Sequence, residues 1–239
     1  MRLDSYIQEK FSLKSKSNAQ DKIKAGYVFI NGKQIKKCGE KVSANAVVEI
    51  KESLEFVSKG GLKLDKGITH FGFDASGKTF VDVGASNGGF THCLLLGGAK
   101  KVYAVDVGEN QLDESLKSDK RVVVMDNTNA RFLTKEHFAE EEIFVVSDVS
   151  FISETMIIPV FASFAREMLL LIKPQFECGK KALNKHGIVT NPKDIEFAIQ
   201  KVAECGESFG YENIGVCEVS HAIQKNKEYM IYFQKMSKN

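Results

Sequence analysis

One stretch of this chain has the composition of a turn that binds a nucleoside. An apolar run at 80–83 is followed by Gly84-Ala85-Ser86-Asn87-Gly88-Gly89, and the next apolar run ends in Asp106, about 20 residues further on. Glycine has no Cβ and tolerates positive φ, so such a turn lets a ligand approach the backbone. The helix expected after it adds unpaired N–H groups that attract anions, and a carboxylate at this spacing can accept hydrogen bonds from ribose hydroxyls. The pattern predicts a nucleoside-cofactor site, with a purely structural turn as the alternative.

A carboxylate and a lysine follow two later apolar runs. Asp148 comes after the run at 143–147, and Lys173 comes after the run at 168–172. In an open α/β sheet, ligands bind beyond the carboxyl ends of the strands, so these side chains should gather at one edge. A Lys–Asp pair is most often a surface ion pair of small energetic value. Beside a nucleotide turn, we interpret this pair as functional.

The elements that must position these residues alternate from Lys78 onward. The expected strands lie at 79–83, 101–106, 121–125, 143–148, 168–173, 211–220 and 228–235, and several are continuous apolar runs, as in a sheet covered on both faces. The expected helices lie at 88–97, 110–117, 134–140, 152–166 and 193–208. The alternation predicts a doubly wound α/β fold with a parallel sheet.

The first part of the chain has a different pattern. Helical spacing of Leu3, Ile7 and Phe11 is followed by a second helical segment, a short strand at 27–30 and the tight-turn dipeptide Asn31-Gly32. Residues 1–58 hold 11 Lys/Arg and 7 Asp/Glu, a net charge of +4, whereas the remainder holds 22 and 24, a net charge of −2. A basic module on a near-neutral body favours a polyanionic partner, and a solvated basic face is the alternative.

Composition excludes several classes of protein. The chain has 239 residues, of which 43% are hydrophobic, enough for one α/β domain and a small module. No apolar run approaches the ~20 residues of a membrane-spanning helix, and the N-terminus lacks the apolar core of a signal peptide, so we expect a cytoplasmic protein. Five scattered cysteines without a C-x-x-C pair argue against a disulfide framework or a zinc site. We place the domain boundary between residues 58 and 59, with a linker at 52–61.

Residues 1–51 resemble the S4 RNA-binding domain. The resemblance rests on the Arg2-Leu3-Asp4 start, the segment from Ser15 to Ala19 and the motif Val28-Phe29-Ile30-Asn31-Gly32-Lys33. It implies an RNA-binding face whose basic residues are Arg2, Lys10, Lys14, Lys16, Lys22 and Lys33. Lys16 stands where the family usually has arginine, and a lysine can meet a phosphate as a point charge but cannot fork onto it.

Five further motifs occur in the order found in the TlyA family, the S4-domain ribosomal-RNA 2′-O-methyltransferases. They are Gly84-Ala85-Ser86-Asn87-Gly88-Gly89-Phe90-Thr91, Asp106-Val107-Gly108, Asn127-Thr128-Asn129-Ala130-Arg131, Asp148-Val149-Ser150-Phe151-Ile152-Ser153 and Lys173-Pro174-Gln175-Phe176-Glu177. The catalytic domain of that family is similar to the FtsJ/RrmJ type. The resemblance covers nearly the whole chain. It implies a small N-terminal α+β S4 domain, followed along the chain by a seven-stranded, mostly parallel, Rossmann-like sheet.

For the active site, the resemblance implies a Lys-Asp-Lys-Glu set, which here is Lys63, Asp148, Lys173 and Glu228. Lys173 would contact the ribose 2′-oxygen and Asp148 would hold and polarise it, while Lys63 and Glu228 would orient the ribose and the lysine. Two positions depart from the family pattern. Lys225 stands where a glycine is usual, and the segment at 56–59 reads Phe-Val-Ser-Lys where Tyr-Val-Ser-Arg is frequent.

The implied cofactor is S-adenosyl-L-methionine. Asp106 should bind its ribose, Asp126 and Asn127 should lie near the adenine, and Phe90 either covers the cofactor or packs in the core. The predicted cofactor residues are Gly84, Ala85, Ser86, Gly88, Gly89, Phe90, Asp106, Val107, Asp126 and Asn127.

The implied substrate is a cytidine ribose in ribosomal RNA or a ribosomal subunit. We expect 23S rRNA ahead of 16S rRNA, because a chain whose first residue lies at the S4 start resembles the group that modifies only the large subunit. We expect a monomer that binds neither a metal ion nor a membrane. Two other functions stay open. An NAD-dependent oxidoreductase shares the turn and carboxylate, although the turn here is not G-x-G-x-x-G, and a non-catalytic ribosome-binding or membrane-acting protein fits relatives labelled haemolysins.

Overall fold

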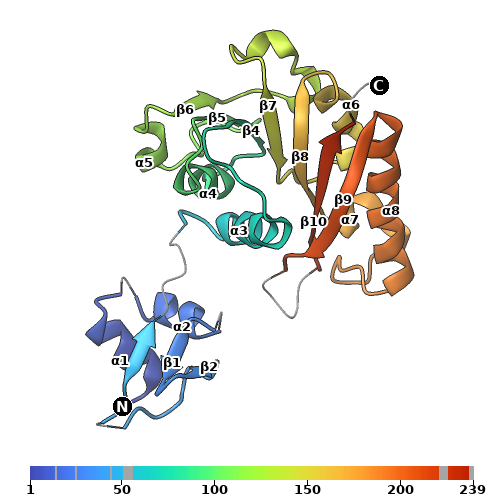
Figure 1. Cartoon of the computed structure of the whole chain (residues 1–239). Coiled ribbons are helices and arrows are strands. Elements are labelled where there is room, and N and C mark those ends of the chain that lie inside the picture. Colours follow the sequence, from blue (N-terminus) through green and yellow to red (C-terminus); the bar gives the residue numbers. More distant parts are fainter. Residues whose placement is uncertain (14, 25, 44, 51–55, 221–225, 237–239) are drawn as a thin grey trace. The chain divides into compact units, whose positions relative to one another are not determined.

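The computed structural model describes all residues except 14, 25, 44, 51–55, 221–225 and 237–239. It separates into two compact units, Met1–Glu55 and Phe56–Asn239 (Figure 1). Each unit has its own hydrophobic core. Phe56 and Val57 pack against the core of the second unit. The boundary after residue 58 stays a prediction.

The first unit has the two helices and the hairpin expected from the sequence. Helices α1 (Leu3–Lys10) and α2 (Lys16–Lys24) are followed by strands β1 (Val28–Ile30), β2 (Lys33–Ile35) and β3 (Val48–Ile50). The strands form an antiparallel sheet in the order β2-β1-β3. Asn31 and Gly32 both have positive φ, 49° and 75°, as a tight two-residue hairpin turn requires.

The second unit is built on a seven-stranded sheet, which confirms the predicted doubly wound architecture. The strands are β4 (Thr79–Val83), β5 (Lys101–Val105), β6 (Val122–Met125), β7 (Ile143–Ser147), β8 (Ala165–Ile172), β9 (Tyr211–Glu218) and β10 (Tyr229–Lys235). Their order is β6-β5-β4-β7-β8-β10-β9. The first five are parallel, and β10 runs antiparallel to both β8 and β9.

Helices cover both faces of this sheet. Successive side chains of a strand point to opposite faces, so each strand contributes apolar side chains to two cores. Phe80 and Phe144 belong to a core that includes Leu64 of helix α3 (Gly60–Phe71) and Phe90 of helix α4 (Gly89–Leu96). Val81, Val83 and Val145 belong to the core on the other face, together with side chains of α6 (Ile158–Phe161) and α8 (Pro192–Ser208). The continuous apolar strands of the sequence are therefore explained by a two-sided core.

Three expected helices differ from the observed elements. Of 110–117, only α5 (Glu114–Lys117) is helical, because Asn110 has a φ of 54° and Asp113 caps the helix by accepting a hydrogen bond from Ser115 N at 2.9 Å. The prediction of a helix at 134–140 is wrong, because only a 3-10 turn at Lys135–His137 forms in this segment. The helix at 152–166 is reduced to a 3-10 turn at Glu154–Met156 and α6, because Ala165 already pairs with Ile143 in the sheet. The remaining short elements are α7 (Pro174–Glu177) and 3-10 turns at Ala130–Phe132 and Lys180–Ala182.

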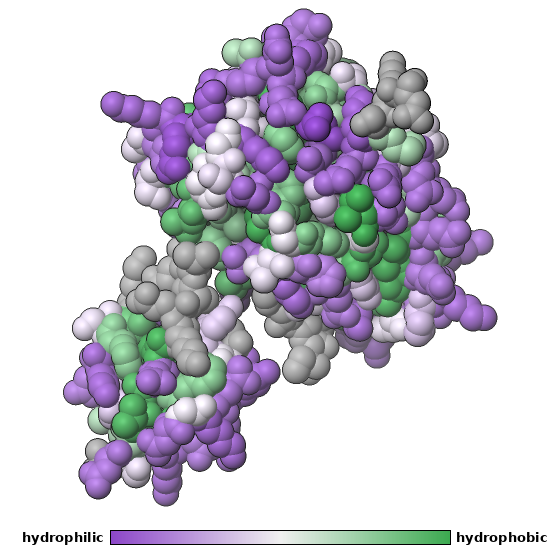
Figure 2. Space-filling view, in the orientation of Figure 1, coloured by the Kyte–Doolittle hydropathy of each residue, from purple (hydrophilic) through white to green (hydrophobic). Residues whose placement is uncertain are grey.

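The surface of the second unit is largely hydrophilic on the face seen in Figure 2, with apolar areas between the polar side chains. Within the part of the chain that the structure describes, none of the helices is both long and apolar enough to cross a membrane.

Candidate active site

The carboxyl ends of four neighbouring strands bring the predicted polar residues to one edge of the sheet. Gly84 follows β4, Asp106 follows β5, Asp148 follows β7 and Lys173 follows β8. The strands are joined up to these residues, since Gly84 N donates to Val105 O at 2.9 Å and Asp148 N donates to Val83 O at 3.0 Å. The fold thus positions the residues that the sequence singled out at the edge where open α/β sheets bind ligands.

The four residues of the predicted Lys-Asp-Lys-Glu set lie together as a chain of alternating charges. Lys173 Nζ lies 2.6 Å from Asp148 Oδ1, and Lys63 Nζ lies 3.6 Å from Asp148 Oδ2. The other partner of Lys63 is Glu228, whose Oε2 atom lies 3.0 Å from Lys63 Nζ. Their side chains are only 9–19% exposed, so these charges interact more strongly than a surface pair in water.

Each of these side chains comes from a different element. Lys63 lies one turn after Gly60, where α3 begins, and a Cβ placed on Gly60 would lie 3.7 Å from Asp148 Oδ2. Lys173 is the residue before Pro174, which starts α7, a position at which proline suits a helix. Glu228 directly precedes β10 and is fixed through its backbone, because its N–H donates to Ser220 Oγ at 2.8 Å and its carbonyl accepts from Val219 N at 2.9 Å.

The turn after β4 has the backbone that its glycines suggest. Gly84, Ser86 and Gly88 all have positive φ, at 79°, 47° and 90°. The glycines are also needed for packing, since a Cβ on Gly84 would lie 2.9 Å from the carbonyl oxygen of Asp148, and one on Gly88 would overlap Leu116. From the sequence, we expected these glycines to let a ligand approach the backbone. In the structure, the missing Cβ atoms leave room for other parts of the protein itself.

Asp106 is oriented by the backbone on both sides of it. Its Oδ2 atom accepts from Ser86 N at 2.8 Å, and its Oδ1 atom accepts from Gly108 N at 2.8 Å. Each carboxylate oxygen can accept a second hydrogen bond. The residue is half-buried, so a diol such as a ribose can reach the remaining lone pairs. This arrangement fits the nucleoside part of the predicted cofactor.

The loops after β5 and β6 are joined beside Asp106. Asn127 N donates to Gly108 O at 3.1 Å, and Thr128 N donates to Asp106 O at 2.9 Å. Asp126 Oδ2 accepts from Asn110 N at 2.9 Å. Asn127 is exposed, and Val107 is 69% exposed. Asp126, Asn127 and Val107 therefore lie around the same turn as Asp106. That Asp126 and Asn127 lie near the adenine stays a prediction.

The predicted cofactor residues of the turn and the following helix differ in burial, since Gly84 is half-buried and Ser86 is exposed. Ala85, Gly88 and Gly89 are covered, and Phe90 is 3% exposed within the core. Of the two roles left open for Phe90, the structure favours core packing.

Two residues at this edge had no role assigned from the sequence. Ser150 accepts a hydrogen bond from Lys173 Nζ at 2.9 Å, and its position in the motif that starts at Asp148 was the available signal. Asp82 is fully buried in β4 and accepts from Thr91 Oγ1 at 2.6 Å. Burial raises the pKa of Asp82 to about 7, because desolvation disfavours the charged form. An aspartate inside an otherwise apolar strand was the signal for this residue.

The predicted RNA-binding residues of the first unit differ in their surroundings. Lys10, Lys16 and Lys33 are exposed, and Lys22 is half-buried, whereas Lys14 lies outside the described residues. Arg2 makes a two-point contact with Asp4, with Nε 3.1 Å from Oδ1 and Nη2 2.8 Å from Oδ2. The Asp4 side chain is fully buried, and the Arg2 guanidinium compensates its negative charge.

Both units match known protein families. Residues 56–235 match the family of FtsJ-like methyltransferases, and residues 1–48 match the S4 domain. Hemolysin A of Brachyspira hyodysenteriae is 40% identical over 241 residues, covering 98% of this chain and 99% of that protein. The 16S/23S rRNA (cytidine-2′-O)-methyltransferase TlyA of Mycobacterium tuberculosis is 36% identical over 220 residues, covering 90% and 82%. The solved structure of a hemolysin candidate from Lactococcus lactis aligns with a TM-score of 0.73 at 38% identity, covering 78% of this chain and 91% of that one.

Proposed function

Because the chain belongs to the FtsJ-like methyltransferase family and begins with an S4 domain, we propose that it methylates the 2′-hydroxyl of a cytidine ribose in ribosomal RNA. The proposed methyl donor is S-adenosylmethionine, and the proposed location is the cytoplasm. Family membership confirms the resemblance drawn from the sequence motifs. It also removes the support for an NAD-dependent oxidoreductase, which rested on the turn and the carboxylate alone.

The observation that carries this proposal is the chain of contacts Lys173–Asp148–Lys63–Glu228 beside the turn at Gly84. A ribose hydroxyl is a poor nucleophile while it is protonated, so the site must hold the oxygen in line and take up its proton. Bound S-adenosylmethionine would supply a methyl group activated by a positively charged sulfur. In this proposal, Asp106 and the turns around it would hold the nucleoside part of the donor.

Each member of the charged chain has a proposed role. Lys173 contacts the 2′-oxygen, and Asp148 holds and polarises Lys173. Lys63, placed between Asp148 and Glu228, orients Asp148, and Glu228 orients the ribose. As the oxygen–methyl bond forms, the methyl–sulfur bond of the donor would break and leave a neutral thioether. Lys173 would pass a proton to the Asp148 carboxylate and take up the hydroxyl proton, so that the proton ends on Asp148. Orientation of two reactants can supply roughly 7–11 kcal/mol, and a positioned proton acceptor contributes about 10²–10⁴-fold.

An RNA substrate is also supported by charge on the second unit. Lys180, Lys181 and Lys185 are exposed in the segment that follows α7, beyond the carboxyl end of β8. Asn226 joins this segment to the residues before β10, because Asn226 Nδ2 donates to Gly187 O at 2.9 Å and Val189 N donates to Asn226 Oδ1 at 2.8 Å. Glu228 lies two residues further along the chain. We propose that these lysines contact phosphates that flank the target ribose.

The proposal is tested by mapping 2′-O-methyl groups on 23S and 16S rRNA, with and without this protein. We expect 23S rRNA to be modified. The 16S rRNA is mapped as well, because the name of the M. tuberculosis relative includes both RNAs. Purified protein should transfer methyl groups from S-adenosylmethionine to rRNA or subunits, and Lys173→Met should abolish the transfer while the fold survives. Absence of any rRNA transfer by folded, cofactor-binding protein would contradict the proposed function.

A second candidate is lysis of cells, favoured by the name of the Brachyspira relative. Purified protein added to red cells separates the two functions. Lysis by the wild type and equally by Lys173→Met would establish an activity independent of the proposed active site.

A further inference from the structure

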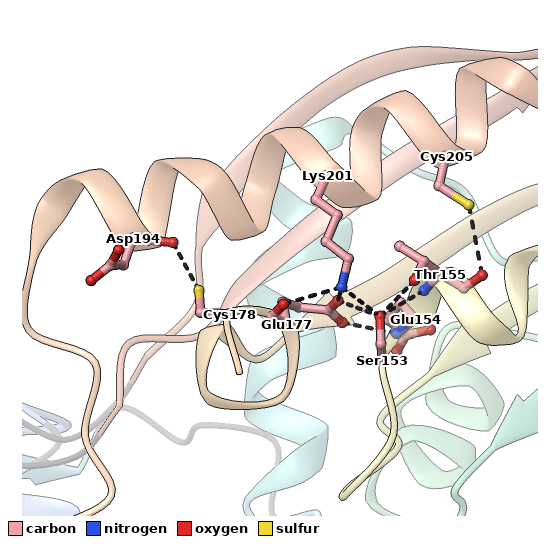
Figure 3. Close-up of polar contacts among 8 residues, drawn as sticks. All are labelled: Ser153, Glu154, Thr155, Glu177, Cys178, Asp194, Lys201 and Cys205. Atoms are coloured by element: carbon pink, nitrogen blue, oxygen red, sulfur yellow. Dashed lines mark hydrogen bonds and ion pairs between the residues drawn. The ribbon is translucent and has the colours of Figure 1, made fainter. Parts of the chain in front are cut away.

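A cluster of polar side chains, two of them buried carboxylates, involves the segments that follow Asp148 and Lys173, and the proposed reaction does not use it. It consists of Ser153, Glu154, Glu177 and Lys201 (Figure 3). The Glu177 side chain is 1% exposed and Glu154 is 1% exposed. Burying a carboxylate is costly unless it is paired and hydrogen-bonded, so the contacts of Glu177 indicate what this cluster does.

The Glu177 carboxylate joins three segments. Its Oε1 atom accepts from the backbone N of Glu154 at 2.8 Å, and its Oε2 atom accepts from Ser153 Oγ. Lys201 reaches it from α8, with Nζ 3.2 Å from Oε2 and 3.1 Å from the Glu177 carbonyl oxygen. The same ammonium lies 3.3 Å from Ser153 Oγ. One ion pair therefore ties the loop after β7 and the turn after β8 to a long helix, as Figure 3 shows.

The two segments joined in this way are those that carry Asp148 and Lys173. Asp148 starts the loop that ends at Ser153 and Glu154, and Lys173 starts the turn that ends at Glu177. At the near end, the segments meet through the Lys173–Asp148 pair at 2.6 Å. At the far end, they meet through Glu177.

The loop between these two ends contains a strained residue. Phe151 has a φ of 66°, a conformation that costs free energy for a bulky side chain and persists only when the surroundings enforce it. Its ring lies 5.3 Å from that of Phe176 between centroids, a further contact between the same two segments. Without a fixed far end, the loop can relax and move Asp148 away from Lys173.

We propose that Glu177, held by Lys201, is a positioning residue that sets the separation of Asp148 and Lys173. The expected loss of methyl-transfer rate rests on the proposed function. The expected displacement of Lys173 from Asp148 rests on the contacts alone. A displacement of about 1 Å can cost on the order of 10²-fold in rate when the reacting groups must be aligned.

The test uses Glu177→Gln and Lys201→Met in the full chain, with Glu196→Gln on the exposed face of α8 as the matched carboxylate control. Methyl transfer to rRNA should slow between about 10-fold and 100-fold in kcat in both variants. The KM values for S-adenosylmethionine and RNA should stay within a factor of about two, since the partners of Glu177 are Ser153, Glu154 and Lys201, and none of these is a predicted cofactor or RNA contact. Lys201→Arg should recover most of the rate, because a guanidinium can also pair with a carboxylate. A double variant should lose little more than either single one.

A second measurement does not depend on activity. The Lys173 side chain is 9% exposed, so its labelling by an amine-reactive reagent, followed by mass spectrometry, reports whether it stays in place. We expect labelling to be several-fold faster in Glu177→Gln and Lys201→Met than in the wild type and in Glu196→Gln. Unfolding midpoints show whether each variant is folded.

The results separate two failures. A wild type that transfers no methyl group to rRNA contradicts the proposed function, and faster Lys173 labelling in the two variants would still support the positioning role. Unchanged kcat and unchanged labelling in folded Glu177→Gln overturn the inference. Equal losses in kcat and in cofactor affinity would also overturn it, because they indicate a general structural defect.

Discussion

The ammonium of Lys63 lies between two carboxylates, 3.0 Å from Glu228 Oε2 and 3.6 Å from Asp148 Oδ2. Asp148 is therefore shared by two lysines, since Lys173 lies 2.6 Å from its other oxygen. Asp148 is thus the one member of the Lys63, Asp148, Lys173 and Glu228 set that contacts both lysines.

Replacing Asp148 with Asn should reduce methyl transfer by about 10²–10⁴-fold, because the amide keeps the shape but leaves buried Lys173 and half-buried Lys63 without their common counter-charge. Cofactor affinity should change little. The measurement is single-turnover transfer of labelled methyl groups to rRNA. Asp74→Asn, an exposed carboxylate in the turn before β4, is the matched control. Wild-type rates in Asp148→Asn would remove Asp148 from the proposed mechanism.

Asp106→Asn should weaken binding of S-adenosylmethionine by roughly 10- to 100-fold, since hydrogen bonds to a charged group are worth about 1.5–3 kcal/mol. The affinity for RNA should be preserved. Calorimetry with the cofactor provides the measurement, and Glu109→Gln, an exposed acidic residue of the same loop, is the control. An unchanged dissociation constant would mean that Asp106 only shapes the turn through Ser86 and Gly108.

Glu154→Gln should change how stability depends on pH. Burial raises the pKa of Glu154 from 4.5 to about 8, so between these values the folded state binds more protons than the unfolded state. The contribution of Glu154 to stability is therefore fully present below pH 4.5 and is lost as the pH rises through about 8. The amide resembles the protonated acid, so the variant should match the wild type at pH 5 and exceed it at pH 8 by on the order of a few kcal/mol.

Denaturant unfolding at the two pH values checks this expectation. Asp82 responds in the same direction because its pKa is raised to about 7, so the Asp82→Asn variant separates the two contributions. A Glu154→Gln variant that is equally destabilised at both pH values would show that a packing defect dominates.

Reversing the charge of Lys16 and Lys33, both exposed on the first unit, should lower RNA affinity and leave cofactor binding unchanged. For each phosphate that is no longer neutralised, the slope of log affinity against log salt should become shallower by about 0.7–0.9. Filter binding across a salt series measures both quantities. Lys100→Glu, an exposed lysine of the second unit near the amino end of β5, is the control. An identical effect of Lys100→Glu would point to net charge alone.

Arg2→Ala should destabilise the first unit, because buried Asp4 would lose its two-point partner. The Arg2 guanidinium and further hydrogen bonds hold the pKa of Asp4 below its usual value of 3.8, so this stabilisation is present above that pH and is lost as the pH falls. Limited proteolysis of the full chain at pH 7 and pH 3 detects the change. Lower RNA affinity without greater protease sensitivity would instead establish Arg2 as a direct contact.

The sequence predicted the sheet well because its strands are continuous apolar runs with turn residues between them. It predicted the two segments on either side of β7, at 134–140 and 152–166, poorly. There, Thr134, His137 and Ala165 look compatible with helices, but local hydrogen bonds form a 3-10 turn and Ala165 joins the sheet. Such outcomes are decided by pairing with a distant strand, which helical spacing alone does not report.

For the candidate site, the ends of two apolar runs were enough to select Asp148 and Lys173, whereas Lys63 and Glu228 were selected only through the family resemblance. The structure places all four in one chain of contacts. Glu154 and Glu177 could not be selected, because their significance lies in burial and in contacts to Lys201 on a helix far along the sequence. The pairing of Arg2 with Asp4 was not visible in the sequence, and the role of Arg2 as an RNA contact stays a prediction.

The position of β10 has a consequence for synthesis of the chain. This strand comes after all the other strands of the sheet in the sequence, yet it lies between β8 and β9. Neither β8 nor β9 can complete its hydrogen bonds until residues 229–235 have left the ribosome, and Glu228 cannot reach Lys63 before then. Long-range pairings of this kind form late and slowly. If the proposed function holds, a nascent chain whose S4 domain has already folded would bind RNA before Glu228 has joined the proposed catalytic centre.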